Sequence, residues 1–107
     1  MKTLKTEIVV VGAGPGGYTA AFYAADKGKK VLLVESEKRL GGACLNSGCI
    51  PSKALLHATK MIRETKESHR RGITYAAPQI ELAKLRSWKD SLLDRLAKGI
   101  AQMGQAR

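Results

Sequence analysis

The two cysteines are the residues of this chain with the clearest capacity for chemistry. Cys44 and Cys49 are separated by four residues and lie in the stretch Gly41–Lys53, which has glycines before and between them and a lysine after them. Two thiols this close in sequence can close a small disulfide ring, and strain in such a ring makes the disulfide easier to reduce. The spacing therefore predicts a redox-active pair.

Two other interpretations of the cysteine pair stay open on the residues alone. As structural thiols, the cysteines would be small buried apolar groups. As metal ligands, they would need two further partners. Only His57 and His69 are available, twelve residues apart on a predicted helix, which is poor geometry for a shared metal. We therefore predict no metal site.

The residues around the cysteines favour the redox interpretation. Gly41, Gly42 and Gly48 give the backbone the freedom to bring two thiols together. Lys53, and a helix N-terminus that we expect near Ser52, would supply positive charge that favours a thiolate.

A glycine-rich turn follows the first apolar run of the chain. Glu7–Val11 is a short β-branched run, typical of a strand buried on both faces of a parallel sheet. Gly12, Gly14 and Gly17 then match G-x-G-x-x-G. The first glycine allows a tight turn, the second lets a pyrophosphate approach the backbone, and the third lets a helix pack close to the strand.

The next elements complete a nucleotide-binding pattern. A helix is predicted to about Lys27, with Gly28 as its stop and an apolar side formed by Tyr18, Ala21, Phe22 and Ala25. Lys30–Val34 predicts a second buried strand. It ends in Glu35, 18 residues after Gly17. A carboxylate at this tip accepts hydrogen bonds from adenosine ribose hydroxyls.

The rest of the chain is mostly helical in pattern. We expect Pro51 to break any helix that the cysteines begin, and Ser52 to cap a helix from Lys53 to about Arg71. We expect a short extended piece at Ile73–Tyr75. A last helix runs from Leu82, with one apolar stripe formed by Leu85, Trp88, Leu92, Leu96, Ile100 and Met103.

This order of elements predicts an α/β fold that is incomplete. A βαβ unit followed by two long helices makes part of a doubly wound, Rossmann-like domain, whose sheet normally has more than two strands. We therefore expect residues 1–107 to be one piece of a longer protein.

Composition and charge narrow the class of protein. The chain has 107 residues, 44% of them hydrophobic, and a net charge of +10. The basic residues are scattered rather than clustered in one tract, so we do not expect a nucleic-acid partner. No apolar run approaches the length of a membrane span or of a signal sequence. The expected location is the cytoplasm.

The two motifs together suggest a function. A nucleotide-binding unit lies directly before a dithiol. If the nucleotide belongs to a flavin, its reactive ring can lie against the disulfide, so that electrons pass between thiols and flavin within the protein.

At these residues the chain resembles the flavin-dependent pyridine nucleotide–disulfide oxidoreductases, and among them the dihydrolipoamide dehydrogenases. The segment Gly41–Leu56 is very close to the active-site segment of that family. The later stretch from Gly72 through Lys89, and Met103 after it, is also similar. The resemblance covers essentially the whole chain but only the first part of the family's length.

The resemblance implies a set of cofactor contacts. Gly12, Gly14 and Gly17 would line the FAD pyrophosphate, and Glu35 would hold the adenosine ribose. The segment from Glu35 to Cys44 would border the cofactor, including Ser36, Gly41, Gly42 and Ala43.

The resemblance also implies catalytic roles. Cys44 would be the interchange thiol that forms a mixed disulfide with a lipoyl group, and Cys49 the charge-transfer thiol that faces the flavin. Lys53 would lie by the flavin ring and stabilise its reduced, anionic form.

For the longer protein, the resemblance implies oxidation of protein-bound dihydrolipoamide and reduction of NAD+ through FAD. Such a protein would be a homodimer, with a lipoyl-bearing acyltransferase or a glycine cleavage carrier protein as partner. Its NAD-binding and dimerisation domains, and its catalytic histidine, would lie outside residues 1–107. We therefore expect no activity from this chain alone. The alternatives are a reductase of the mercuric or glutathione type and a non-catalytic, truncated nucleotide-binding fragment.

Overall fold

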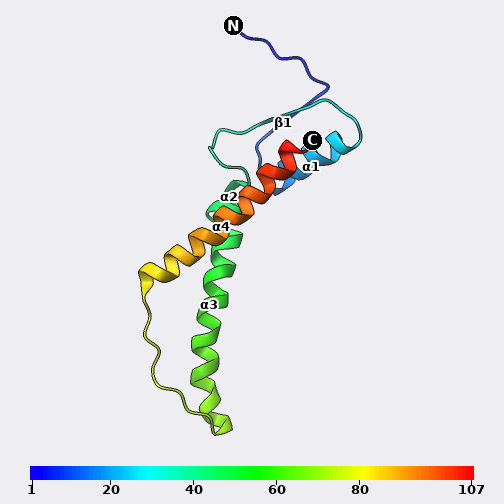
Figure 1. Ribbon diagram of the computed structural model, residues 1–107. Helices are drawn as coiled ribbons and strands as arrows, with labels where there is room; N and C mark the ends of the chain where they lie inside the picture. The colour runs from blue at the N-terminus through cyan, green and yellow to red at the C-terminus, as the bar shows by residue number, and fades with distance from the viewer.

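A βαβ unit forms the first part of the molecule. The computed structural model describes residues 1–107, in which β1 (Ile8–Val11), α1 (Pro15–Asp26) and β2 (Val31–Val34) follow one another. The two strands pair in parallel, from Ile8 opposite Val31 to Val11 opposite Val34. This two-stranded sheet and its crossover helix confirm the partial, Rossmann-like α/β fold (Figure 1).

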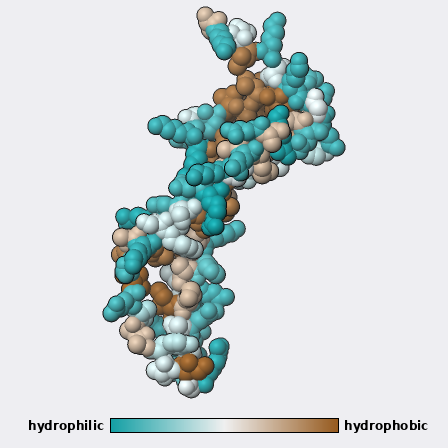
Figure 2. Space-filling model, in the orientation of Figure 1, coloured by the Kyte–Doolittle hydropathy of each residue, from teal (hydrophilic) through white to brown (hydrophobic).

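The sheet is covered on one face only. Alternate side chains of β1 are half-buried and exposed, with Val9 at 55% and Val11 at 82% exposure. Successive side chains of a strand point to opposite faces, and α1 packs against only one of them. The prediction that both strands are buried on both faces is therefore wrong for this chain. Figure 2 shows apolar surface gathered at this end of the molecule.

Three further helices follow the βαβ unit. They are the short α2 (Gly42–Asn46), α3 (Cys49–Glu67) and α4 (Leu82–Gln105), with a 3₁₀ turn η1 (Ser68–Arg71) after α3. The residues between η1 and α4 form no strand, so the extended piece expected there adds nothing to the sheet. None of the helices has both the length and the apolar character needed to cross a membrane.

Helix α3 begins earlier than the sequence predicts. Its first residue is Cys49, and the first intrahelical bond runs from the Ser52 N–H to the Gly48 carbonyl, at 3.1 Å. Pro51 does not break the helix, because the first turn of a helix needs no backbone N–H donors. Ser52 is not the cap. Its hydroxyl donates to the Cys49 carbonyl at 3.0 Å, from inside the helix.

The buried side of α4 differs from the predicted stripe. Leu93 and Ala97 are buried and pack with Leu45 of α2, while Leu96 and Trp88 stay 40% and 42% exposed. The apolar side of α4 is wider than the predicted stripe, and its buried residues are those that face α2. The main core therefore lies between α2 and α4, next to the cysteines. Below it, α3 and α4 diverge (Figure 1).

Candidate active site

The two cysteines are joined by a disulfide at the junction of two helices. Cys44 lies in α2 and Cys49 is the first residue of α3, with their Cα atoms 4.6 Å apart. The turn between the helices is tight. A Cβ atom at Gly48 would lie 3.1 Å from the Ala43 carbonyl oxygen. Cys44 is half-buried and Cys49 is exposed. The predicted disulfide is thus present, and it stands at the positive end of a 19-residue helix.

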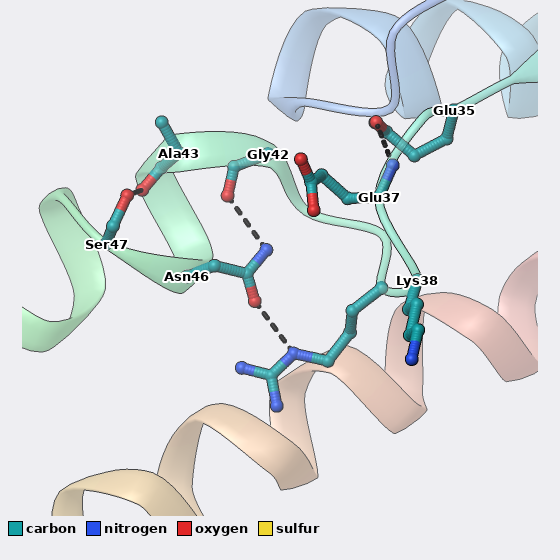
Figure 3. Close-up of a pocket in the computed structure, with 8 residues that line it drawn as sticks. Glu35, Glu37, Lys38, Gly42, Ala43, Asn46 and Ser47 are labelled. Atoms are coloured by element: carbon teal, nitrogen blue, oxygen red, sulfur yellow. Dashed lines mark hydrogen bonds between the residues drawn. The ribbon is translucent and has the colours of Figure 1, made fainter.

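Asn46 fixes the shape of the segment that carries Cys44. Its side-chain amide donates to the carbonyl oxygens of Gly42 at 2.8 Å and Leu40 at 3.3 Å. Its side-chain oxygen accepts from Nε of Arg39 at 2.8 Å (Figure 3). The sequence alone predicts no role for Asn46 or Arg39. The available signal was an amide side chain inside the cysteine segment, which can bond to nearby backbone.

The cysteine segment meets the glycine-rich turn through backbone contacts. The Gly41 N–H donates to the Ala13 carbonyl at 2.8 Å, and Ala13 is fully buried. A Cβ atom at Gly42 would lie 2.7 Å from the Cα atom of Gly14. Gly41 has φ +111° and Gly42 has φ +62°, values that favour glycine. The two motifs recognised in the sequence are therefore side by side.

The glycines of the first motif have the geometry that their spacing predicts. Gly12 has φ +95°, and its N–H donates to the Val34 carbonyl at 2.7 Å. A Cβ atom at Gly17 would overlap the carbonyl oxygen of Gly12. The turn is therefore as tight as close packing of helix on strand requires, and it leads to Gly14, the N-cap of α1.

Glu35 lies at the carboxyl edge of the two strands and is held by backbone donors. Its carboxylate accepts from the N–H of Ala13 at 2.7 Å and of Glu37 at 3.1 Å, and from the Ser36 hydroxyl at 3.3 Å. The N–H groups of Glu37 and Ala13 lower the pKa of Glu35 below its ordinary value of 4.5. The carboxylate is thus ionised at neutral pH.

An open cleft of about 710 Å³ joins Glu35 to the segment that carries Cys44 (Figure 3). Three predicted cofactor residues, Glu35, Gly42 and Ala43, line it together. The remaining lining residues are Glu37, Lys38, Arg39, Asn46 and Ser47.

The other predicted site residues, both cysteines among them, do not line this cleft. Ser36 is exposed beside it. Lys53 is exposed one turn after Cys49 on α3, and it takes part in none of the ion pairs. Residues four apart share a helix face, so the amine of Lys53 and the sulfur of Cys49 lie on the same side of α3.

These residues fit the nucleotide part of a flavin cofactor. Helix α1 has twelve residues, and no side chain caps its N-terminus. Its first N–H groups therefore have no acceptor within the helix and suit a pyrophosphate. The absent side chains of Gly14 and Gly42 let the two backbones lie close together at this end. The carboxylate of Glu35 keeps further lone pairs for ribose hydroxyls.

This chain matches known proteins of one family. The family described as "Pyridine nucleotide-disulphide oxidoreductase" matches residues 6–106. Curated relatives named dihydrolipoyl dehydrogenase include those of Haemophilus influenzae, 50% identical, Buchnera aphidicola from Acyrthosiphon pisum, 45% identical, and Vibrio parahaemolyticus, 46% identical. Each alignment covers 99% of this chain and 22% of the relative.

The chain thus spans about a fifth of the length of the curated relatives that it matches. Within that part the glycine turn contacts both the strand-end carboxylate and the segment that carries the disulfide. The resemblance stated from the sequence is confirmed, and the chain belongs to the pyridine nucleotide-disulphide oxidoreductase family.

Proposed function

We propose that this chain is the FAD-binding, disulfide-bearing part of a dihydrolipoyl dehydrogenase, an oxidoreductase that passes electrons from a lipoyl dithiol to NAD+. One observation carries the proposal. The segment that holds Cys44 is joined to the glycine-rich turn by the hydrogen bond from the Gly41 N–H to the Ala13 carbonyl, at 2.8 Å. A cofactor whose pyrophosphate lies on that turn can extend toward the disulfide.

In this proposal the cofactor is held by residues of both motifs. The N-terminus of α1 and the turn formed by Gly12, Gly14 and Gly17 bind the pyrophosphate of FAD. Glu35 holds the adenosine ribose. The remaining contacts come from the segment after β2, with Ser36, Gly41, Gly42 and Ala43.

The cysteines carry out the exchange with the substrate. A lipoyl thiolate attacks Sγ of Cys44, the disulfide opens, and Cys49 leaves as a thiolate. The second lipoyl thiol then displaces Cys44, so the lipoyl group leaves as a cyclic disulfide and two electrons remain on the cysteines. The N-terminus of α3 and the amine of Lys53 stabilise the Cys49 thiolate. When bound, FAD supplies the two-electron acceptor that restores the disulfide and passes the electrons on to NAD+.

The proton transfers of this reaction need a base that this chain does not place near the sulfurs. His57 is eight residues after Cys49, about 12 Å along the axis of α3 at 1.5 Å per residue. His69 lies farther still, in η1, where its Nδ1 is 2.5 Å from the Lys66 carbonyl oxygen. We therefore propose that the base, the NAD site and the surface for a homodimer lie in other parts of the protein. The lipoyl-bearing partner, an acyltransferase or a glycine cleavage carrier protein, would meet the assembled enzyme.

The test uses the purified 107-residue chain with FAD. We expect the flavin fluorescence to fall on binding, and two free thiols to appear on treatment with dithiothreitol. With dihydrolipoamide and NAD+ we expect no NADH. Uptake of FAD without a reducible disulfide would favour a non-catalytic nucleotide-binding fragment. The absence of both would overturn the proposal.

A Cys49→Ser variant is the matched control for the thiols. It keeps the glycine turn and Glu35, so it should still take up FAD, while the cycle of two thiols and one disulfide is lost. For the longer protein, a preference for oxidised glutathione or for mercuric ion over dihydrolipoamide would favour the other reductases of the family.

A further inference from the structure

We propose that α4 is a positioning element for the redox disulfide. Through Arg39 and Asp94 it holds α2, so that Cys44 stays opposite Cys49 when the bond between them opens. This inference rests on the redox role proposed above. It adds two positioning residues, neither of which lies in the cysteine segment.

A chain of polar contacts leads from α2 to α4. Asn46, the last residue of α2, accepts a hydrogen bond from Nε of Arg39 at 2.8 Å. A terminal nitrogen of the same guanidinium is paired with the carboxylate of Asp94 on α4. Arg39 thus contacts both helices with one rigid, planar group.

An apolar contact supports the same junction. Leu45 lies between Cys44 and Asn46 and is 5% exposed, and it packs against Leu93 and Ala97 of α4. Ile50, the neighbour of Cys49, packs against this cluster as well. The residues flanking each cysteine therefore rest on the same side of α4.

Helix α2 cannot hold its own position. It has five residues, and isolated helices this short are unstable because nucleation is costly. In the oxidised chain the disulfide ties α2 to α3. In the reduced chain that bond is absent, and the contacts with α4 add to the tight turn at Gly48 in keeping the Cys44 thiol near the Cys49 thiol.

This arrangement raises the effective concentration of each thiol at the other. Reduction of the disulfide by dithiothreitol takes up two electrons and two protons, and dithiothreitol becomes its cyclic disulfide. A looser α2 disfavours reclosure in this equilibrium. Weakening the contact with α4 should therefore make the disulfide easier to reduce.

The experiment measures that equilibrium in the 107-residue chain. The protein is incubated with set ratios of reduced and oxidised dithiothreitol, quenched in acid and alkylated, and its thiols are counted by mass. An exposed ion pair contributes roughly 0.2–1 kcal/mol. We therefore expect Asp94→Asn to shift the equilibrium constant by up to about fivefold, and by at least about 1.4-fold, toward the dithiol.

Asp26→Asn is the matched control. Asp26 pairs with Arg107 at 2.8 Å, which joins the C-terminal end of α4 to α1 rather than to α2. The same chemical change there should leave the dithiol equilibrium unchanged. An equal shift in both variants would mean that the effect is not specific to the contact of Asp94 with Arg39, and it would overturn the inference.

Arg39→Gln separates positioning from charge. It removes a positive charge, whereas Asp94→Asn removes a negative one, so a purely electrostatic effect on the thiolates would shift the two variants in opposite directions. A loss of positioning shifts the equilibrium of both variants toward the dithiol. Opposite shifts, or no shift in Asp94→Asn, would overturn the inference.

Circular dichroism checks the fold of each variant. If Arg39→Gln fails to fold, the pair Asp94→Asn and Asp26→Asn decides. A failure of the proposed function is distinct, because it appears in the unmodified chain as absent flavin uptake together with absent dithiol formation.

Discussion

At the scale of single residues, Ala13 is the point where three segments meet. Its N–H donates to the carboxylate of Glu35 and its carbonyl accepts from the N–H of Gly41. The residue is fully buried between two glycines of the turn. Because both contacts use the backbone, this junction depends on the conformation of the turn rather than on the alanine side chain.

Gly17→Ala should damage the turn at this junction. The new Cβ atom would overlap the backbone carbonyl of Gly12, which cannot move aside as a side chain could. We expect a loss of about 1–3 kcal/mol in the free energy of unfolding, as for other overpacked sites, and a loss of FAD uptake. Urea unfolding and flavin fluorescence measure the two effects.

Gly16→Ala is the control for that substitution. Gly16 is in the same helix, and a Cβ atom there would meet nothing within 4 Å. Alanine favours helix over glycine, so the stability should be unchanged or slightly raised. Equal losses in the two variants would contradict the steric explanation.

Glu35 should make the stability depend on pH. Its pKa is lowered in the folded chain by the N–H groups of Glu37 and Ala13. A group whose pKa is depressed by folding contributes stability above its unfolded pKa and loses that contribution as the pH falls through its folded pKa. The free energy of unfolding of the unmodified chain should therefore exceed that of Glu35→Gln by its full amount at pH 7. This difference should decline as the pH falls below 4.5, the ordinary pKa of the group. Urea unfolding at a series of pH values from neutral to acidic measures it, and a constant difference across the series would contradict this origin.

The residue patterns predicted the two motifs and the disulfide, but not how they join. Gly12, Gly17 and Glu35 are recognisable because their roles demand a residue type at a fixed spacing. The pairing of Arg39 with Asp94 depends on where α4 lies. No spacing within one segment contains that information.

At the scale of elements, the boundary of α3 changes the surroundings of the disulfide. The predicted cap at Ser52 would place the positive end of the helix after the cysteines. The helix instead begins at Cys49, so the sulfur of this residue is in the first turn, where the helix dipole favours a thiolate. The sequence prediction failed because Pro51 was treated as a break, although proline is compatible with a first turn.

A pair of leucines on α4 tests which side of that helix is buried. Leu93→Ala removes a side chain that is 4% exposed and packed on Leu45, and the expected loss in the free energy of unfolding is about 2–5 kcal/mol. Leu96→Ala removes a side chain that is 40% exposed, so its loss should be clearly smaller. Urea unfolding followed by circular dichroism gives both values, and the reverse order would restore the stripe predicted from the sequence.

The wide apolar stripe of α4 explains why the sequence misplaced its buried side. Leu92, Leu93 and Leu96 are all apolar, and periodicity alone does not choose among them. The choice depends on Leu45, which projects from α2 onto one side of α4. The local sequence is thus enough to predict that α4 forms, whereas the side of α4 that is buried depends on tertiary contacts.

At the scale of the whole molecule, the buried residues are few and the shape is long. Nine of 107 residues are buried. The apolar side chains of Val9, Val11 and Val34 remain exposed on the open face of the sheet. The fold was predictable as an incomplete doubly wound unit, because two strands and one crossover helix cannot cover both faces of a sheet.

The divergence of α3 and α4 also affects the elution volume of the molecule in size-exclusion chromatography. The chain extends over 67 × 27 × 19 Å with a radius of gyration of 20.1 Å, whereas a compact chain of this length has about 13 Å. A single copy would therefore elute from a sizing matrix ahead of globular standards of equal mass. Calibrating against such standards would suggest an oligomer, so the mass of this chain in solution is better taken from light scattering.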